Sequence, residues 1–230
     1  MNNLAIIPAR GGSKRIPRKN IKDFLGAPII SYSIQAARNS GLFKTIMVST
    51  DDAEIAQIAK ENGAEIPFFR SPENSDDHAT TAAVLQEVLE SYKELGSAFN
   101  HACCIYPCAP LIQSEKLIQA YELLLTGFDS VLPIVPFGYP LNRALQTRNG
   151  RIHFSSPEFA GSRSQDLPTY YHDSGQFYWL EVPAFLKSKQ LITENTGYVK
   201  LSEIEAQDID TEEDWILAEL KYKLANEMAK

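Results

Sequence analysis

Short apolar runs alternate with segments of helical periodicity over the first 135 residues of the chain. Strands are predicted at 4–8, 45–49, 64–69, 101–106 and 130–134, and helices at 28–39, 53–62, 80–95 and 115–125. This alternation predicts a three-layer, Rossmann-like α/β fold in which helices cover both faces of a mostly parallel sheet. Ligands of such sheets bind beyond the carboxyl ends of the strands, so we expect a functional site on that rim.

The pattern changes between about 136 and 171, where Pro, Tyr, Arg, Ser and Gly are frequent and alternation is confined to residues 151–154. We interpret this segment as an inserted arm or hairpin at a subunit interface. Beyond it, strands are predicted at 175–180 and 196–201, and helices at 183–188 and 215–228. We therefore expect one domain over residues 1–230, with an arm at about 136–171 that suggests a homodimer.

Composition excludes several classes of protein. The 230 residues carry a formal net charge of −7, and no basic helix or broad basic face suggests nucleic-acid binding. No segment resembles a signal peptide or approaches the roughly 18 apolar residues of a membrane helix. Cys103, Cys104 and Cys108 form an odd, clustered set, typical of reduced thiols rather than of a disulfide framework or a zinc site. We therefore expect a cytoplasmic protein with no membrane partner.

A strongly basic loop follows the first predicted strand and precedes the first predicted helix. Six cations and no acid lie within thirteen residues: Arg10, Lys14, Arg15, Arg18, Lys19 and Lys22. Gly11 and Gly12 allow a tight turn that brings backbone N–H groups close to an anion. This order of elements is typical of phosphate binding, so we expect a polyphosphate ligand. A solvated basic loop is the alternative, and the spacing fits neither a Walker loop nor a dinucleotide fingerprint.

Two carboxylates precede the last predicted helix, in the segment Asp208-Ile209-Asp210. Alternate side chains of an extended segment share a face, so both carboxylates point the same way. Such a pair suits Mg²⁺, which completes its coordination shell with phosphate oxygens and water. The alternative is that Asp210 only caps the helix.

The segment between residues 70 and 81 also contains groups suited to a nucleotide. An arginine at the end of a strand, Arg70, could donate to a base carbonyl, and Thr80 or Thr81 could bond the base or ribose. The alternative is a helix start capped by Asp76 or Asp77, and the two interpretations are compatible.

The segment from His172 to Trp179 mixes polar groups with aromatic rings. Neighbouring residues of a strand face opposite ways, so His172 and Asp173 do not indicate a hydrolase triad, and Ser174 lacks the context of a nucleophile elbow. We expect substrate contacts here. A plain edge strand with a packed aromatic side is the alternative.

Together these motifs resemble the CMP-sialic acid synthetase family, the cytidylyltransferases that activate acidic sugars. The resemblance covers nearly the whole chain and is carried, in order, by Ile7-Pro8-Ala9-Arg10-Gly11-Gly12-Ser13-Lys14, Lys19-Asn20, Ser49-Thr50-Asp51-Asp52, Arg70-Ser71-Pro72 and Asp208-Ile209-Asp210. Within the family the chain is most similar to the branch that activates pseudaminic acid, through Arg15-Ile16-Pro17-Arg18-Lys19-Asn20, Tyr106-Pro107-Cys108-Ala109-Pro110 and Asp173-Ser174-Gly175-Gln176-Phe177-Tyr178-Trp179. Sialic acid enzymes generally carry Gln-Pro-Thr-Ser-Pro in place of the Tyr106 motif, which disfavours transfer to ordinary sialic acid.

The resemblance implies a fold of the nucleotidyltransferase type and a reaction in which CTP and pseudaminic acid give CMP-pseudaminic acid and pyrophosphate. The implied partners are CTP, an acidic nine-carbon sugar and a second copy of the chain. It assigns the phosphates to residues of the basic loop: Ala9, Arg10, Gly11, Gly12, Ser13 and Lys14. Of these, Arg10 and Lys14 would be catalytic together with Lys19.

The resemblance also implies roles for residues outside the basic loop. Asn20, Arg70 and Thr80 would bind the nucleoside, and Asp208 with Asp210 would hold Mg²⁺. The sugar would be bound by Tyr106, Gln176, Tyr178, Arg143 and Arg163. The two arginines would reach its carboxylate, as arm residues, from a partner subunit. No general base is assigned, because the motifs place no histidine or glutamate at the site.

Three alternatives stay open at the level of sequence. The acceptor could be N-acetylneuraminic or legionaminic acid, which only a comparison of substrates separates. A glycosyltransferase of similar fold could use the two aspartates as its metal motif, but the basic loop would then be unexplained. A noncatalytic nucleotide-binding regulator would have little reason to retain both the loop and the aspartate pair.

Overall fold

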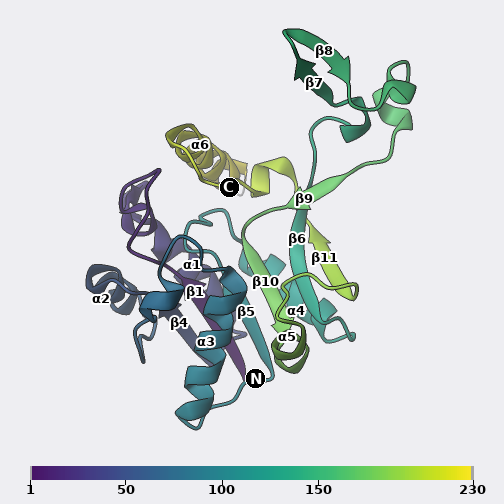
Figure 1. Ribbon diagram of the computed structural model, residues 1–230. Coiled ribbons are helices and arrows are strands. Elements are labelled where there is room, and N and C mark those ends of the chain that lie inside the picture. Colours follow the sequence, from purple (N-terminus) through teal and green to yellow (C-terminus); the bar gives the residue numbers. More distant parts are fainter. Residues whose placement is uncertain (1, 229–230) are drawn as a thin grey trace.

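The computed structural model describes residues 2–228 and contains a central seven-stranded sheet within them (Figure 1). The sheet order is β11-β6-β10-β5-β1-β4, and β9 also pairs with β6. The strands are β1 (Asn3–Pro8), β4 (Thr45–Ser49), β5 (His101–Ile105), β6 (Ser130–Pro136), β9 (Tyr171–Asp173), β10 (Phe177–Glu181) and β11 (Thr196–Lys200). The strand β1 is parallel to both of its neighbours, and β6 is parallel to β11. The strands β9 and β10 run antiparallel to their neighbours, and the other five strands share one direction, so the sheet is mostly parallel, as predicted.

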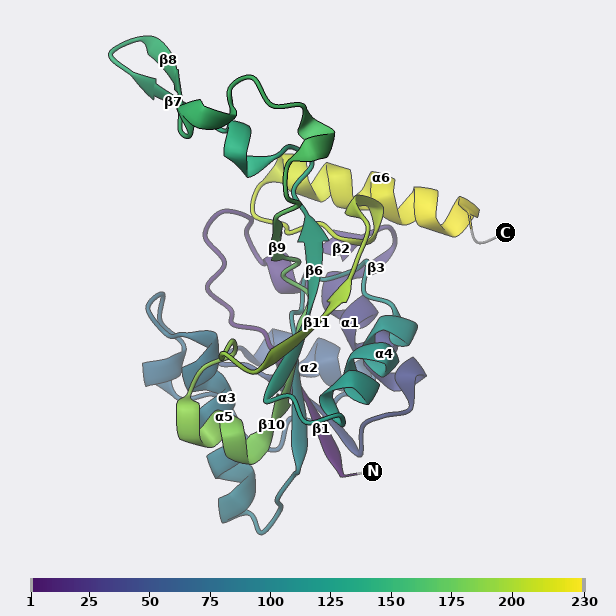
Figure 2. The same cartoon turned by 90° about the vertical axis from the view of Figure 1, so that its right-hand side faces the viewer.

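Helices cover both faces of the sheet (Figure 2). The helices are α1 (Ile29–Ser40), α2 (Ala53–Glu61), α3 (Thr81–Glu94), α4 (Ser114–Leu124), α5 (Val182–Ser188) and α6 (Glu212–Met228). In β1, Ala5 and Ile7 join the apolar cluster formed with α1, α2 and α4, whereas Leu4 and Ile6 join the one formed with α3 and α5. Alternate side chains of a strand point to opposite faces, so an apolar run without polar interruption belongs to a strand buried on both sides. The three-layer α/β prediction is confirmed.

A third apolar cluster joins α6 to the carboxyl-end rim of the sheet. It contains Trp215 and Ala218 of α6, Ile209 before the helix, and residues near the short hairpin of β2 (Asp23–Phe24) and β3 (Ala27–Pro28). Phe24 is fully buried there and packs edge-on against Trp215, with ring centroids 5.5 Å apart. This packing holds the C-terminal helix beside the basic loop.

The segment between β6 and β9 forms an arm that projects from the body (Figures 1 and 2). It contains a hairpin of β7 (Leu145–Arg148) and β8 (Arg151–Phe154), and three 3-10 turns: η3 (Leu141–Arg143), η4 (Pro157–Phe159) and η5 (Ser164–Asp166). Asn149 and Gly150 both adopt positive φ, the conformation that a tight two-residue hairpin requires. Every residue of the two hairpin strands is exposed.

Two local predictions differ from the structure. The strand expected at 64–69 is reduced to a single bridge between Glu65 and Met47, because Pro67 has no N–H to extend the ladder. The cap of α3 is Thr80, whose hydroxyl accepts the Ala83 N–H, rather than an aspartate at 76 or 77.

No helix within residues 2–228 is both long and apolar enough to cross a bilayer.

Candidate active site

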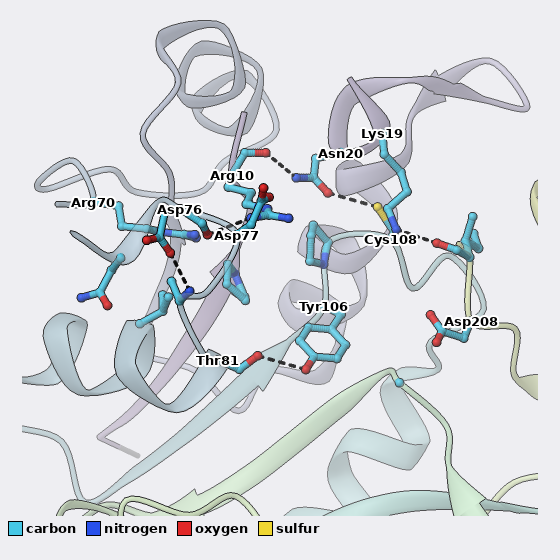
Figure 3. A pocket seen from close by; sticks show the side chains of 17 residues that line it. Arg10, Lys19, Asn20, Arg70, Asp76, Asp77, Thr81, Tyr106, Cys108 and Asp208 are labelled. Carbon is cyan, nitrogen blue, oxygen red and sulfur yellow. Dashed lines mark hydrogen bonds and ion pairs between the residues drawn. The ribbon is translucent and has the colours of Figure 1, made fainter. Parts of the chain in front are cut away.

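A cavity of about 300 Å³ opens beyond the carboxyl ends of β1 and β5, on the rim that the sequence predicts (Figure 3). The side chains around it come from loops that are far apart in the sequence. Its lining includes Arg10, Lys19, Asn20, Arg70, Asp76, Asp77, Thr81, Tyr106, Cys108, Gly175 and Asp208. In the view of Figure 3, Arg70 and Asp208 lie on opposite sides of the cavity.

Asn20 connects the two ends of the basic loop to each other and to the loop that follows β5. It lies in the 3-10 turn η1 (Lys19–Ile21) and is only 6% exposed. Its Nδ2 donates to the Arg10 carbonyl at 2.9 Å, and its Oδ1 accepts the Cys108 thiol at 3.1 Å. Burial raises the pKa of Cys108 to about 12, so the thiol is neutral and can donate. The bond fixes the Asn20 amide and, through it, the Arg10 backbone.

The Gly-Gly segment approaches α2 closely. The Gly11 N–H donates to Asp51 Oδ1 at 2.9 Å, and a Cβ on Gly11 would lie 2.7 Å from Asp52 Oδ2. A larger residue at position 11 would require Asp52, which caps α2 and pairs with Arg18, to shift. The adjacent Ala9 is buried in the core, and its N–H donates to the Ser49 carbonyl at 2.9 Å. The backbone of the loop is therefore positioned by β4 and by the start of α2, which Asp52 caps.

Each of the six cations of the basic loop is paired with a carboxylate of the same chain. Asp77 pairs with both Arg10 and Lys14, and Asp210 pairs with both Arg15 and Lys19. The remaining pairs are Arg18 with Asp52 and Glu54, and Lys22 with Glu212. Arg10 and Lys19 line the cavity, whereas Lys14 lies outside that set and is 78% exposed. Gly12 and Ser13 lie in the same loop, also outside the lining set.

Asp208 lies at one end of the cavity, whereas Asp210 lies outside its lining and lines an adjoining cavity. Asp208 and Asp210 flank Ile209, which is buried at 1% exposure, so the expected alternation is present. Enclosure by protein, and then the Asp210 charge, raises the pKa of Asp208. The helix α6 is capped by Thr211 and Asp214, whose side chains accept each other's backbone N–H groups, so Asp210 is not needed as its cap.

The donor set can be tested against a metal ion. Among residues 2–228, no three His, Cys, Asp or Glu side chains are grouped so that they could hold a metal by themselves. Two carboxylates are present, and carboxylate oxygens are ligands that Mg²⁺ accepts alongside water and phosphate. The chain therefore fits a Mg²⁺ ion that takes most of its ligands from the substrate and solvent.

Arg70 lies at the other end of the cavity and is 8% exposed. Its Nε donates to Ser49 Oγ at 3.0 Å and its Nη2 donates to the Ser49 carbonyl, while burial lowers its pKa. Thr80, the cap of α3, is exposed, whereas Thr81 lines the cavity and shares a hydrogen bond of 3.1 Å with the Tyr106 hydroxyl. The geometry therefore favours Thr81 over Thr80 as a ligand contact.

Tyr106 lines the cavity, and its two predicted companions lie behind it. Tyr178 is buried, donates to Asp173 and packs edge-on to Tyr106 with centroids 5.7 Å apart. Gln176 is 2% exposed and donates to the Glu205 carbonyl at 2.6 Å. Burial raises the pKa of both tyrosines, so both are neutral phenols. In this chain Gln176 and Tyr178 support the wall on which Tyr106 lies.

The two arginines expected to reach the sugar lie on the arm. Arg163 pairs with Asp166 at 2.7 Å, and Arg143 donates to Ser164 Oγ at 3.4 Å. The structure therefore does not bring them together with the cavity of their own chain; they lie on the projecting segment of Figure 1.

A second cavity, of about 550 Å³, lies between the base of the arm and the aspartate pair. It shares Asp208 with the first cavity, and His172 and Ser174 line it. The Ser174 Oγ is buried and has no hydrogen-bond partner within the described residues. Sequence reasoning gave no role to this opening, considered Asp77 only as a possible helix cap, and assigned no contact to Cys108 within the Tyr106 motif.

Similarity to known proteins identifies the family of the chain. A family model described as "Cytidylyltransferase" matches residues 4–200. The chain belongs to the cytidylyltransferase family. The pseudaminic acid cytidylyltransferase of Campylobacter jejuni subsp. jejuni serotype O:2 is 42% identical over 231 residues, which cover 100% of both chains. The CMP-N,N'-diacetyllegionaminic acid synthase of Legionella pneumophila is 30% identical and covers 99% of both.

Solved structures show the same fold. A CMP:2-keto-3-deoxy-manno-octonic acid synthetase complexed with CTP aligns with a TM-score of 0.71 and 17% identity, covering 99% of this chain and 100% of that one. The predicted family and the nucleotidyltransferase type of fold are thus confirmed, and the chain is a nucleotidyltransferase of the CTP-using kind.

Proposed function

We propose that this cytidylyltransferase transfers CMP from CTP to the anomeric hydroxyl of pseudaminic acid and releases pyrophosphate. The observation that carries the proposal is one cavity lined by cations of the basic loop, with a buried arginine at one end and Asp208, two residues from Asp210, at the other. A relative named for pseudaminic acid, 42% identical over the full length of both chains, supports this choice of sugar.

The cations would act by positioning and by neutralising charge. Transfer at a phosphorus atom requires in-line alignment and compensation of charge on the phosphate oxygens, with no covalent intermediate on the protein. Arg10 and Lys19 line the cavity and would contact the phosphates, with Lys14 at the outer edge. Asn20 holds the Arg10 backbone, and Arg70 lies where the cytosine would be bound.

Mg²⁺ fits Asp208 and Asp210, and when bound it would supply charge neutralisation at the phosphates and at the attacking hydroxyl. Lys19 lies 3.7 Å from an Asp210 oxygen, so the same region also presents a fixed cation. Among the described residues that line the cavity there is no histidine or glutamate, and the Tyr106 phenol is neutral. A protein side chain is therefore not assigned as the general base.

The sugar would lie between Tyr106 and Asp208; in the view of Figure 3 Asp208 lies across the cavity from Arg70. We propose that Arg143 and Arg163 bind its carboxylate from the arm of a second copy, in a homodimer. Their position on a projecting segment, away from the cavity of their own chain, supports this role. The three free cysteines are consistent with a cytoplasmic location.

The test is pyrophosphate release with CTP and Mg²⁺, measured in parallel with pseudaminic, legionaminic and N-acetylneuraminic acids. We expect turnover with pseudaminic acid at least tenfold above that with either other acid. The 30% identity to a legionaminic acid enzyme makes that acid the principal alternative. A preference for legionaminic acid would retain the reaction and overturn the choice of sugar. If none of the three acids supports pyrophosphate release, the proposal is wrong.

A further inference from the structure

Asp77 differs from the other acids that neutralise the basic loop. Arg18 and Lys22 pair with Asp52, Glu54 and Glu212, which lie outside the residues that line the cavity. Asp77 lines the cavity and pairs at once with Arg10 and Lys14, the two cations of the Gly-Gly segment. These are two of the three cations to which the proposed function assigns the phosphates, so a carboxylate lies where a phosphate is expected.

The loop that carries Asp77 is ordered by its own contacts. It runs from the 3-10 turn η2 (Pro72–Asn74) to α3. The Asp76 side chain accepts the N–H groups of His78 and Ala79, both at 2.8 Å, while its carbonyl accepts Arg10 Nη1 at 2.8 Å. Asp77 is therefore presented to the cations by a defined turn.

We propose that Asp77 is an internal anion that competes with CTP and pyrophosphate for Arg10 and Lys14, and that either ligand must displace it. The inference rests on the proposed role of these cations in holding phosphates. One carboxylate carries a single charge and is 41% exposed, so its ion pairs are weak enough for a more highly charged ligand to replace. The competition lowers the affinity for pyrophosphate, and so it favours departure of that product.

Direct binding of inorganic pyrophosphate in the presence of Mg²⁺ tests the proposal, measured by calorimetry for Asp77→Asn. We expect about three- to tenfold tighter binding than wild type at low salt. The gain should shrink at high salt, because screening weakens exposed ion pairs. The KM for CTP should fall by a similar factor, with the KM for the sugar unchanged.

Glu54→Gln and Glu212→Gln are matched controls. Each removes one negative charge that pairs with a cation of the same loop but lies outside the cavity lining. We expect pyrophosphate affinity within about twofold of wild type for both, because neither acid competes for the site. Equal gains in all three variants would reduce the effect to net charge and overturn the proposal.

Weaker binding by Asp77→Asn would also overturn it, because Asp77 would then support the bound state. Binding of pyrophosphate by neither wild type nor variant would overturn the phosphate role of the loop and the inference with it. A substrate panel that selects another acidic sugar would leave the inference unchanged, because pyrophosphate binding does not depend on the acceptor.

Discussion

The basic loop and the arm both contain several cations, but the two segments differ in the contacts that hold them in place. In the loop, Lys19 donates to the Ile209 carbonyl and Lys22 to Glu212, both 190 positions away in the sequence. In the arm, the Arg163 pair is made to a residue three positions away, and large side chains such as Tyr139 and Ile152 are 87% and 68% exposed. The loop is thus ordered by its own chain, whereas the arm presents surface that only another molecule could cover.

Substitutions of Asp208 and Asp210 should lower activity the most. The Mg²⁺ that they would hold neutralises charge both at the phosphates and at the attacking hydroxyl. We expect Asp208→Asn and Asp210→Asn to lower Mg²⁺-dependent turnover by roughly a hundredfold or more. Without Mg²⁺ the Asp208→Asn protein should be at least as stable as wild type, because the raised pKa shows that the folded site disfavours the charged carboxylate. Kinetics and thermal unfolding check the two statements. Glu213→Gln, an exposed acid on α6, is the control; an equal loss of turnover there would argue against the pair.

Within the basic loop, a cation that lines the cavity should contribute more transition-state stabilisation than an exposed one. Arg10→Ala should cost about 2–4 kcal/mol of transition-state stabilisation, as for the loss of one electrostatic donor. Lys14→Ala should cost less than about 1 kcal/mol, because this ammonium is largely exposed. The values of kcat/KM for CTP measure both. A Lys14 effect as large as that of Arg10 would show that the loop closes further over the ligand.

The arm prediction tests whether its cations act across subunits. We expect the double variant Arg143→Ala, Arg163→Ala to raise the KM for the sugar about tenfold and to leave the KM for CTP unchanged. At a sugar concentration far below KM, mixing it with the Asp210→Asn protein should give roughly a quarter of wild-type activity, since about half of the dimers are mixed and each of these contains one intact site. If mixing restores nothing although sedimentation shows a dimer, the arm does not complete its partner's site.

The smallest effect concerns the stability of the loop. Arg18 holds the pKa of Asp52 down to about 2, so the bond stabilises the fold above about pH 4 and is lost as the pH falls towards 2. We expect Asp52→Asn to cost about 1 kcal/mol at pH 7, because the charge at the start of α2 is removed. Urea unfolding should show that the difference in free energy of unfolding between wild type and variant disappears between pH 4 and 2.5. If the difference persists at pH 2.5, the charge on Asp52 is not its cause.

Much of the fold could be predicted because local patterns of apolar and polar residues indicate its strands and helices. Strands buried on both faces, such as β1, read as uninterrupted apolar runs, and their order placed the rim correctly. The direction of β10 could not be predicted, since it follows from the path of the arm and not from the strand's composition. Pro67 is visible in the sequence, but its effect depends on the neighbour that β4 provides.

The candidate site was predictable where it is a contiguous motif. Arg10, Asn20 and Asp208 line one cavity, as the motifs suggested. The direction of a side chain was not predictable, so Lys14 and Thr80 were expected at the ligand although both are exposed. Contacts between loops carry no periodic signal, which is why the bonds made by Asp77 and Cys108 appear only in three dimensions.

Both ends of the arm are connected to strands of the central sheet. It leaves from β6 and returns as β9, which pairs back onto β6 with Ile134 opposite Asp173. Two residues later Gly175 lies against Asp208, whose Cγ would be 3.6 Å from a Cβ at that glycine. A molecule that bound the hairpin and displaced it would therefore act first on this strand pair, which leads directly into the loop that contacts Asp208.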